Sequence, residues 1–284
     1  MDNAITNDAV IEPAYKRSSE NELSPDDPSW GIPAAIGMWL FSIALIVIVP
    51  AFFLVPYLAA RPEGMPKGDE LVTLLTKDPT GIFLQIIAVI PAHIITIAAA
   101  WFVITRAGRD SFTKALGWRS GGFKWWHYIS ITVAFFLLMA VVGQYIPVVE
   151  DDLQRIIMSS RAALYTVALM AVFTAPIVEE VIYRGLLYSA FQRKVGTVIS
   201  VLLVTILFTS VHVPQYWENP SKIALIAFLS LVLTLMRTAS GNLLPAIILH
   251  TMFNSISAIQ MILEPYLKTL EKTDTAALIH HFLK

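Results

Sequence analysis

The chain has 284 residues and a net charge of −1, and its composition is 56% hydrophobic and only 14% charged. A soluble domain has about a quarter of its residues charged, so this chain has too little polar surface for a water-exposed exterior. The near-neutral charge and the lack of a basic stripe argue against nucleic-acid binding, and the absence of cysteine excludes a disulfide framework, a thiolate metal site and a cysteine nucleophile.

The length of the apolar runs predicts a multi-pass membrane protein. Residues 1–30 are polar and predict a disordered N-terminal tail. A hydrocarbon core of about 30 Å needs roughly 20 apolar residues in a helix. Runs near this length give seven candidate spans, in chain order 32–60, 81–105, 127–149, 164–187, 197–213, 223–236 and 243–263. An eighth span would require a split of the long first or fourth run.

The fold class that follows is all-α, a polytopic transmembrane bundle of about 7–8 spans over residues 31–263, with a C-terminal tail at 264–284. Backbone groups in lipid must be bonded within the protein, which leaves helices or closed barrels, and these runs are too long for barrel strands. Residues 61–80 hold prolines and mixed charge and predict an interfacial loop. Residues 106–126 are basic and end on two tryptophans, which suits the cytoplasmic face and favours a cytoplasmic N-terminus.

The fourth span contains the strongest candidate site, at Glu179, Glu180 and Arg184. Ionisable groups at membrane depth are costly, so each is a functional candidate. Glu180 and Arg184 are four residues apart, hence on one helical face, where a carboxylate and a guanidinium can pair. Glu179 is rotated by roughly 100° from Glu180 on an ideal helix, which leaves it free to accept a proton as a general base. The alternative is a helix end with an ordinary Glu–Arg pair.

Two later spans add polar residues. Phe208 and His212 lie one turn apart at the end of the fifth span, and His250 and Asn254 are four apart in the middle of the seventh. A lone histidine at a helix end is often structural, and asparagine can act as a bridge between helices. The His250–Asn254 pair favours function. His93, in the second span, has no partner at helical spacing and is interpreted as structural.

Together these residues suit acyl hydrolysis. Glu179, helped by His212, would activate water, while Asn254 and His250 would stabilise the oxyanion. A zinc site made by Glu179, His212 and His250 is an open alternative. A serine protease with its nucleophile in the 238–241 loop is a weaker one, because four small residues before a helix are usually a turn.

The three motifs, Glu-Glu-x-x-x-Arg, Phe-x-x-x-His and His-x-x-x-Asn, occur in this order on successive predicted membrane helices. In this order and setting they resemble the CPBP family, which includes type II CAAX prenyl endopeptidases and bacterial Abi-type proteins linked to bacteriocin processing and self-immunity. The resemblance covers about residues 160–260. It implies a glutamate-type intramembrane protease without an obligate catalytic metal or other cofactor, although metal involvement has been argued for the family.

The resemblance also implies roles for individual residues. Glu179 would activate water together with His212, Glu180 and Arg184 would organise the site, and His250 and Asn254 would form the oxyanion side. The implied partners are a peptide or lipidated-protein substrate and membrane lipid, with no nucleic acid, and the implied location is a bacterial inner membrane. Two alternatives stay open, a non-catalytic immunity or scaffold protein of the same fold and an ion- or proton-coupled transporter.

Overall fold

The computed structural model describes residues 24–145 and 160–282, and within these ranges it has helices but no β-strand. The first half contains α1 (Ile32–Ala59), α2 (Asp69–Lys77), α3 (Pro79–Ile87), α4 (Val89–Ile104), α5 (Phe112–Leu116) and α6 (Trp125–Tyr145). The second half contains α8 (Arg161–Leu169), η1 (Met170–Thr174), α9 (Ala175–Glu180), η2 (Val181–Leu187), α10 (Tyr188–Val195), α11 (Thr197–Ser210), α12 (Pro220–Ser240) and α13 (Leu244–Phe282). The predicted all-α fold class is therefore confirmed.

Six helical stretches in the described ranges are long and apolar enough to cross a membrane, and α11 is a shorter apolar helix. The first and fourth spans are not split: α1 is one helix, and residues 161–195 form one continuous stretch. The sixth span is longer than the predicted 223–236: α12 begins at Pro220, behind an Asn219 cap, and ends at Ser240, before the Gly241 cap. The predicted end of the third span at residue 149 lies outside the described residues.

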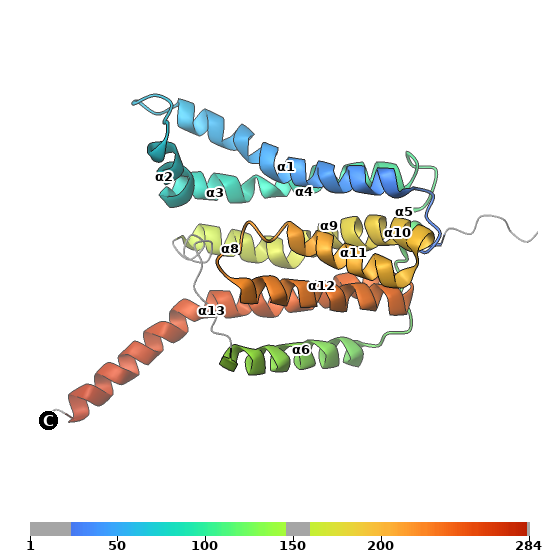
Figure 1. Cartoon of the computed structure of the whole chain (residues 1–284). Coiled ribbons are helices and arrows are strands. Elements are labelled where there is room, and N and C mark those ends of the chain that lie inside the picture. The colour runs from blue at the N-terminus through green and yellow to red at the C-terminus, as the bar shows by residue number, and fades with distance from the viewer. Residues whose placement is uncertain (1–23, 146–159, 283–284) are drawn as a thin grey trace, which may run out of the picture.

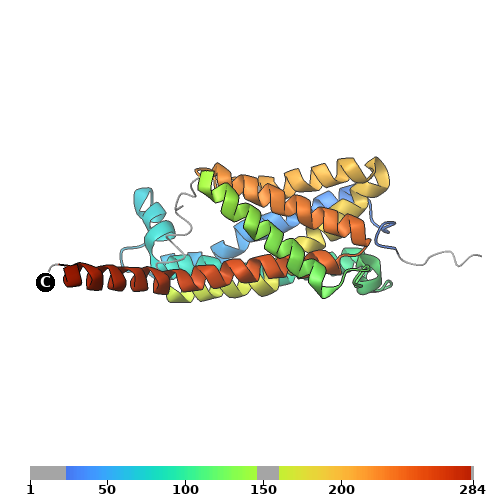
Figure 2. The same ribbon diagram turned by 90° about the horizontal axis from the view of Figure 1, so that it is seen from below.

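The helices form a bundle with the fourth span at its centre (Figure 1). α1 packs against α4 on one side of this central stretch, and α12 packs against both α11 and α13 on the other. α6 contacts α13 and crosses it obliquely when the bundle is viewed from below (Figure 2). The later part of the central stretch is enclosed by protein, since every residue of η2 is buried, whereas Leu169 and Phe173 nearer its start are exposed. Enclosure is expected of a segment that carries charged residues.

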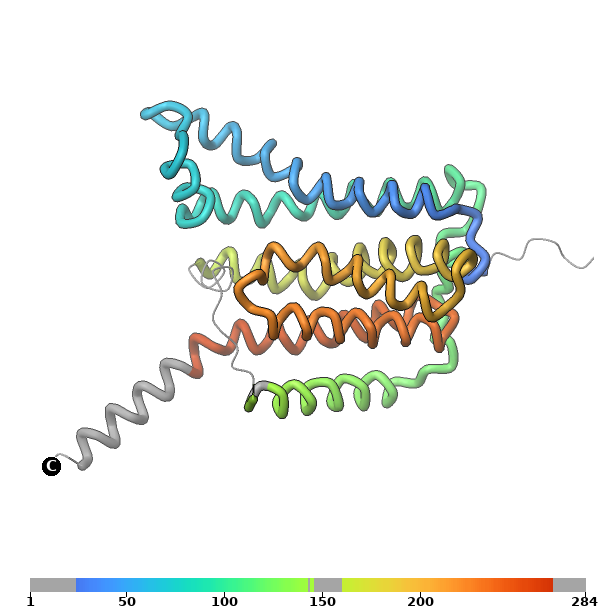
Figure 3. The backbone as a smooth tube through the Cα atoms, in the orientation of Figure 1, coloured from blue at the N-terminus to red at the C-terminus, as the bar shows by residue number. Residues whose placement is uncertain are grey.

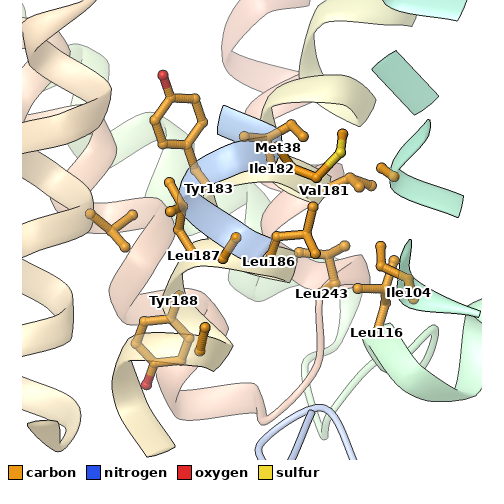
Figure 4. Close-up of a cluster of buried hydrophobic side chains, with 14 of the residues drawn as sticks. Met38, Ile104, Leu116, Val181, Ile182, Tyr183, Leu186, Leu187, Tyr188 and Leu243 are labelled. Carbon is orange, nitrogen blue, oxygen red and sulfur yellow. The ribbon is translucent and has the colours of Figure 1, made fainter. Parts of the chain in front are cut away.

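The outer surface of the bundle carries many large apolar side chains. Large apolar side chains such as Val47, Phe52 and Val198 are exposed on its outer surface, where lipid would contact them. The interior combines fully buried polar groups with an apolar cluster around η2, which includes Leu186 and Leu187 (Figure 4). The outward apolar surface is what a bilayer requires and what water would penalise.

Several connections gather at one end of the bundle: the start of α1, the α4–α6 loop and the α10–α11 and α12–α13 turns (Figure 3). Residues 24–30, which the composition places in the polar tail, pack against this end. The Trp30 indole donates to the Leu186 carbonyl at 3.1 Å, and Asp26 pairs with the buried Arg237 at 2.8 Å. Burial of Trp30 and the charge of Arg237 fix this segment to the core.

The loop around α5 is joined to the α12–α13 turn by backbone contact. Leu243 donates its N–H to the carbonyls of Leu116 and Gly117. Gly117 has φ +74°, and a Cβ there would lie 2.9 Å from Asn242 Cα and 2.8 Å from Pro25 Cγ. Only glycine satisfies both the left-handed backbone and this close approach.

We predict that Gly117→Ala destabilises the protein more than Gly122→Ala. Gly122 has φ +84° but open space around its Cβ position, so its substitution carries the left-handed strain alone, about 1–2 kcal/mol. Gly117→Ala adds steric overlap worth about 1–3 kcal/mol more. Thermal unfolding in detergent measures both variants, and equal losses of stability would contradict the close packing of this loop.

Candidate active site

The central stretch is interrupted by two wider turns. η1 (Met170–Thr174) and η2 (Val181–Leu187) are π-helical, and the short α9 between them ends on Glu179 and Glu180. Turns of this kind are rare and occur frequently at functional sites. The two adjacent carboxylates therefore lie between two shifts of helical register.

Glu180 and Arg184 form the predicted ion pair. Arg184 Nη1 donates to Glu180 Oε1 at 2.7 Å, and neither side chain has exposed surface. α12 provides the other acceptors for the guanidinium, which donates to Ser230 O at 3.0 Å, Ser230 Oγ at 2.9 Å and Thr234 Oγ1 at 3.2 Å. Its carbon also lies 4.7 Å from the Phe208 ring centre. The buried charge is thus paired and hydrogen-bonded, as burial requires.

His250, from α13, lies between the two carboxylates. Its Nδ1 is 2.8 Å from Glu180 Oε1 and its Nε2 is 3.8 Å from Glu179 Oε2. A carboxylate only accepts hydrogen bonds, so His250 Nδ1 carries a hydrogen and donates a hydrogen bond to Glu180. The other ring nitrogen, Nε2, is directed at Glu179. This arrangement differs from the predicted one, in which His250 belongs with Asn254 on the oxyanion side.

The two glutamates have the unequal environments that their spacing predicts. The Glu180 side chain has no exposed surface, whereas that of Glu179 is 27% exposed. Helical rotation directs Glu179 away from Arg184, so it does not share the guanidinium. Of the two carboxylates, Glu179 is the one that a water molecule or substrate can reach.

His212 and Phe208, from α11, complete an aromatic cluster beside the ion pair. His212 Nδ1 lies 2.7 Å from the Phe208 carbonyl, which fixes the proton on Nδ1 and leaves Nε2 as an acceptor when the ring is neutral. The Phe208 ring is 4.8 Å from the His212 ring, 6.3 Å from the His250 ring and 4.9 Å from the Tyr183 ring, between centres. Phe208 therefore holds both histidines in one cluster with Arg184.

Asn254 and His93 both contact η1, from opposite sides of the central stretch. Asn254 Nδ2 donates to the Ala171 carbonyl at 2.8 Å, and His93 Nδ1 lies 2.9 Å from Thr174 Oγ1. His93, which the sequence leaves without a partner at helical spacing, thus has its partner on another helix. Asn254 has a backbone partner in addition to the oxyanion role that the resemblance implies.

The partners of Arg184 on α12 were not identified in the sequence. Ser230, Thr234 and Thr238 recur every fourth residue along the sixth span, so they form a polar stripe on one face. Thr234 and Thr238 donate to carbonyls of their own helix as well as contacting Arg184 or Tyr188. The four-residue spacing is the feature of the sequence that indicates this stripe. It is easily overlooked, because serine and threonine are common in apolar membrane helices.

The two alternative mechanisms find little geometric support. Ser240 Oγ contacts the carbonyls of Arg237 and Asn242 at 3.3 and 2.8 Å, while His250 is engaged with Glu180. In the described part of the chain, no group of three or more histidine, aspartate or glutamate side chains is arranged to hold a metal ion. Glu179, His212 and His250, the alternative zinc ligands, thus do not form such a group.

The fold and this cluster define a polytopic membrane protein with a buried carboxylate–arginine–histidine site. Residues 161–256 match the family model of type II CAAX prenyl endopeptidase Rce1-like proteins. This region is therefore similar to the CAAX protease family, a family of membrane hydrolases. The matched region begins at α8 and ends within α13, so α1–α6 lie outside it. No curated protein and no solved structure matches the chain.

We predict that Arg184→Ala destabilises the fold by about 3–5 kcal/mol, because it leaves Glu180 as a buried charge without its guanidinium. Arg106→Gln is the control, since Arg106 pairs with Asp110 on the exposed surface and surface pairs contribute little. Unfolding in detergent gives both values. Adding Glu180→Gln to Arg184→Ala should recover part of the loss; no recovery would argue against charge burial as its cause.

Proposed function

We propose that the protein is an intramembrane endopeptidase that hydrolyses a peptide bond in a membrane-associated or lipidated, CAAX-like substrate. The observation that carries this proposal is the unequal pair of carboxylates. Glu180 is buried against Arg184 and His250, while the partly exposed Glu179 lies 3.8 Å from His250 Nε2. The family match supports a protease of this class.

Glu179 is the proposed general base. Its 3.8 Å separation from His250 Nε2 is too long for a direct hydrogen bond, and a water molecule can bridge two polar groups at such a distance. Glu179 takes one proton from this water as the oxygen bonds to the substrate carbonyl carbon. The proton then moves from Glu179 to the amide nitrogen as the C–N bond breaks, which yields a carboxylic acid and an amine.

The oxyanion of the tetrahedral intermediate needs hydrogen-bond donors, and Asn254 is the first candidate. One N–H of its amide is donated to the Ala171 carbonyl, and the amide nitrogen carries a second hydrogen. His250 can donate from Nε2 when it carries a second proton, because its Nδ1 is already engaged with Glu180. His212 has its Nε2 available to accept a proton from water or substrate, in support of Glu179.

Glu180 and Arg184 hold the reacting groups rather than contact the substrate. Glu180 fixes the ring and tautomer of His250, in the way that a carboxylate orients the histidine of a serine protease. Arg184 holds Glu180 and is itself held by α12. The substrate is proposed to be a peptide or a lipidated protein, reached from the membrane lipid, and the location a bacterial inner membrane.

We predict that the detergent-purified protein cleaves a farnesylated CAAX peptide, that Glu179→Gln abolishes cleavage, and that excess chelator has no effect. The amide of glutamine cannot take a proton from water, although it has nearly the same shape, so unfolding should be unchanged. Glu70→Gln, on the exposed surface of α2, is the control and should cleave normally. Mass spectrometry of the peptide measures the products.

Other results would contradict parts of this proposal. Cleavage by Glu179→Gln at the wild-type rate would overturn Glu179 as the base. No cleavage of prenylated or unprenylated membrane peptides by a well-folded sample would overturn the protease assignment, and would favour an immunity or scaffold protein or a transporter.

A further inference from the structure

The Ala171 carbonyl has lost its normal partners in the central stretch. In an α-helix it would accept from the N–H of residue 175. The π-turn redirects that N–H, and Ala175 donates to Met170 O instead. In a continued π-turn the donor would be residue 176, but this is Pro176, which has no N–H. Neither residue 175 nor residue 176 therefore donates a hydrogen bond to the Ala171 carbonyl.

Asn254 takes the place of the missing backbone donor. Its Nδ2 lies 2.8 Å from Ala171 O, across the contact between α13 and η1. The turn is held on its other side by the His93–Thr174 contact of 2.9 Å, and Thr174 Oγ1 in turn donates to Met170 O at 3.3 Å. An unsatisfied backbone carbonyl is expensive at membrane depth, so this bond has a strong reason to persist.

The bond also determines where the rest of the Asn254 amide lies. The side-chain amide is planar, so donation of one N–H to Ala171 fixes the direction of the second N–H. Asn254 lies one helical turn after His250 on α13, hence on the same face as the residue that contacts Glu179 and Glu180. A fixed donor beside the carboxylates is what a preorganised oxyanion site requires.

We propose that Pro176 is a positioning residue: by denying the Ala171 carbonyl a helical donor, it forces Asn254 to supply one and so holds the Asn254 amide in its reactive orientation. The catalytic part of this inference rests on the proposed protease function, whereas the structural coupling between Pro176 and Asn254 does not. The two parts can therefore fail separately.

A double-mutant cycle tests the structural coupling. Leucine has the same number and branching of side-chain heavy atoms as asparagine but cannot donate, so Asn254→Leu should lower Tm in the otherwise wild-type protein by leaving Ala171 O unsatisfied. In a Pro176→Ala background residue 176 regains an N–H, and the same Asn254→Leu change should lower Tm by less than half as much. Equal Tm shifts in the two backgrounds would overturn the coupling.

Kinetics test the positioning role. Pro176→Ala should lower kcat for the farnesylated peptide at least tenfold, with KM within twofold of wild type and Tm unchanged or raised. Pro56→Ala, at a proline inside α1, is the matched control and should leave kcat unchanged. An unchanged kcat in Pro176→Ala, with wild type active, would overturn the positioning role while the protease function stands. A well-folded wild type that cleaves neither prenylated nor unprenylated membrane peptides would overturn both, and the Tm cycle would still decide the coupling.

Discussion

A carboxylate and a guanidinium, Glu180 and Arg184, lie 2.7 Å apart at the centre of the bundle with no exposed surface. Burial of two charges is unfavourable unless each is paired and its remaining hydrogen-bonding groups are satisfied. That requirement extends the pair into a network: Arg184 reaches Ser230 and Thr234 on α12, and Glu180 accepts from His250 on α13. The ion pair therefore sets the relative positions of three helices, and any sliding of one would leave a buried charge without a partner.

The same constraint explains why the site differs from its surroundings. The bundle exposes apolar side chains on its outside and buries Glu180 and Arg184, so these two charged groups cannot be satisfied by bulk water and must be satisfied by other protein groups. Helical rotation then separates the two adjacent glutamates. Glu180 is committed to structure, and Glu179 is left partly exposed beside the free nitrogen of His250. A buried ion pair, hydrogen-bonded to α12 and α13, thus supports one reactive carboxylate.

Much of this arrangement was predictable from the sequence, because it depends on helical spacing. The i, i+4 spacing predicts the Glu180–Arg184 pair, and the change of face predicts the different environment of Glu179. Spacing within one helix gives no information on contacts between helices, so the position of His250 between the two carboxylates and the bond from Asn254 to Ala171 were not foreseen. The π-turns shift the register in a way that apolar periodicity does not reveal. Short hydroxyl side chains likewise concealed the role of Ser230 and Thr234.

The most direct test of the central claim, that Glu179 activates water rather than attacking the substrate itself, is a single turnover in water enriched in oxygen-18, with protein in excess over peptide. If Glu179 is a general base, the new C-terminal carboxylate of the product carries the label and the peptide fragment containing Glu179 carries none. Label in the Glu179 side chain, with unlabelled oxygen transferred to the product, would indicate a covalent acyl intermediate and contradict the account.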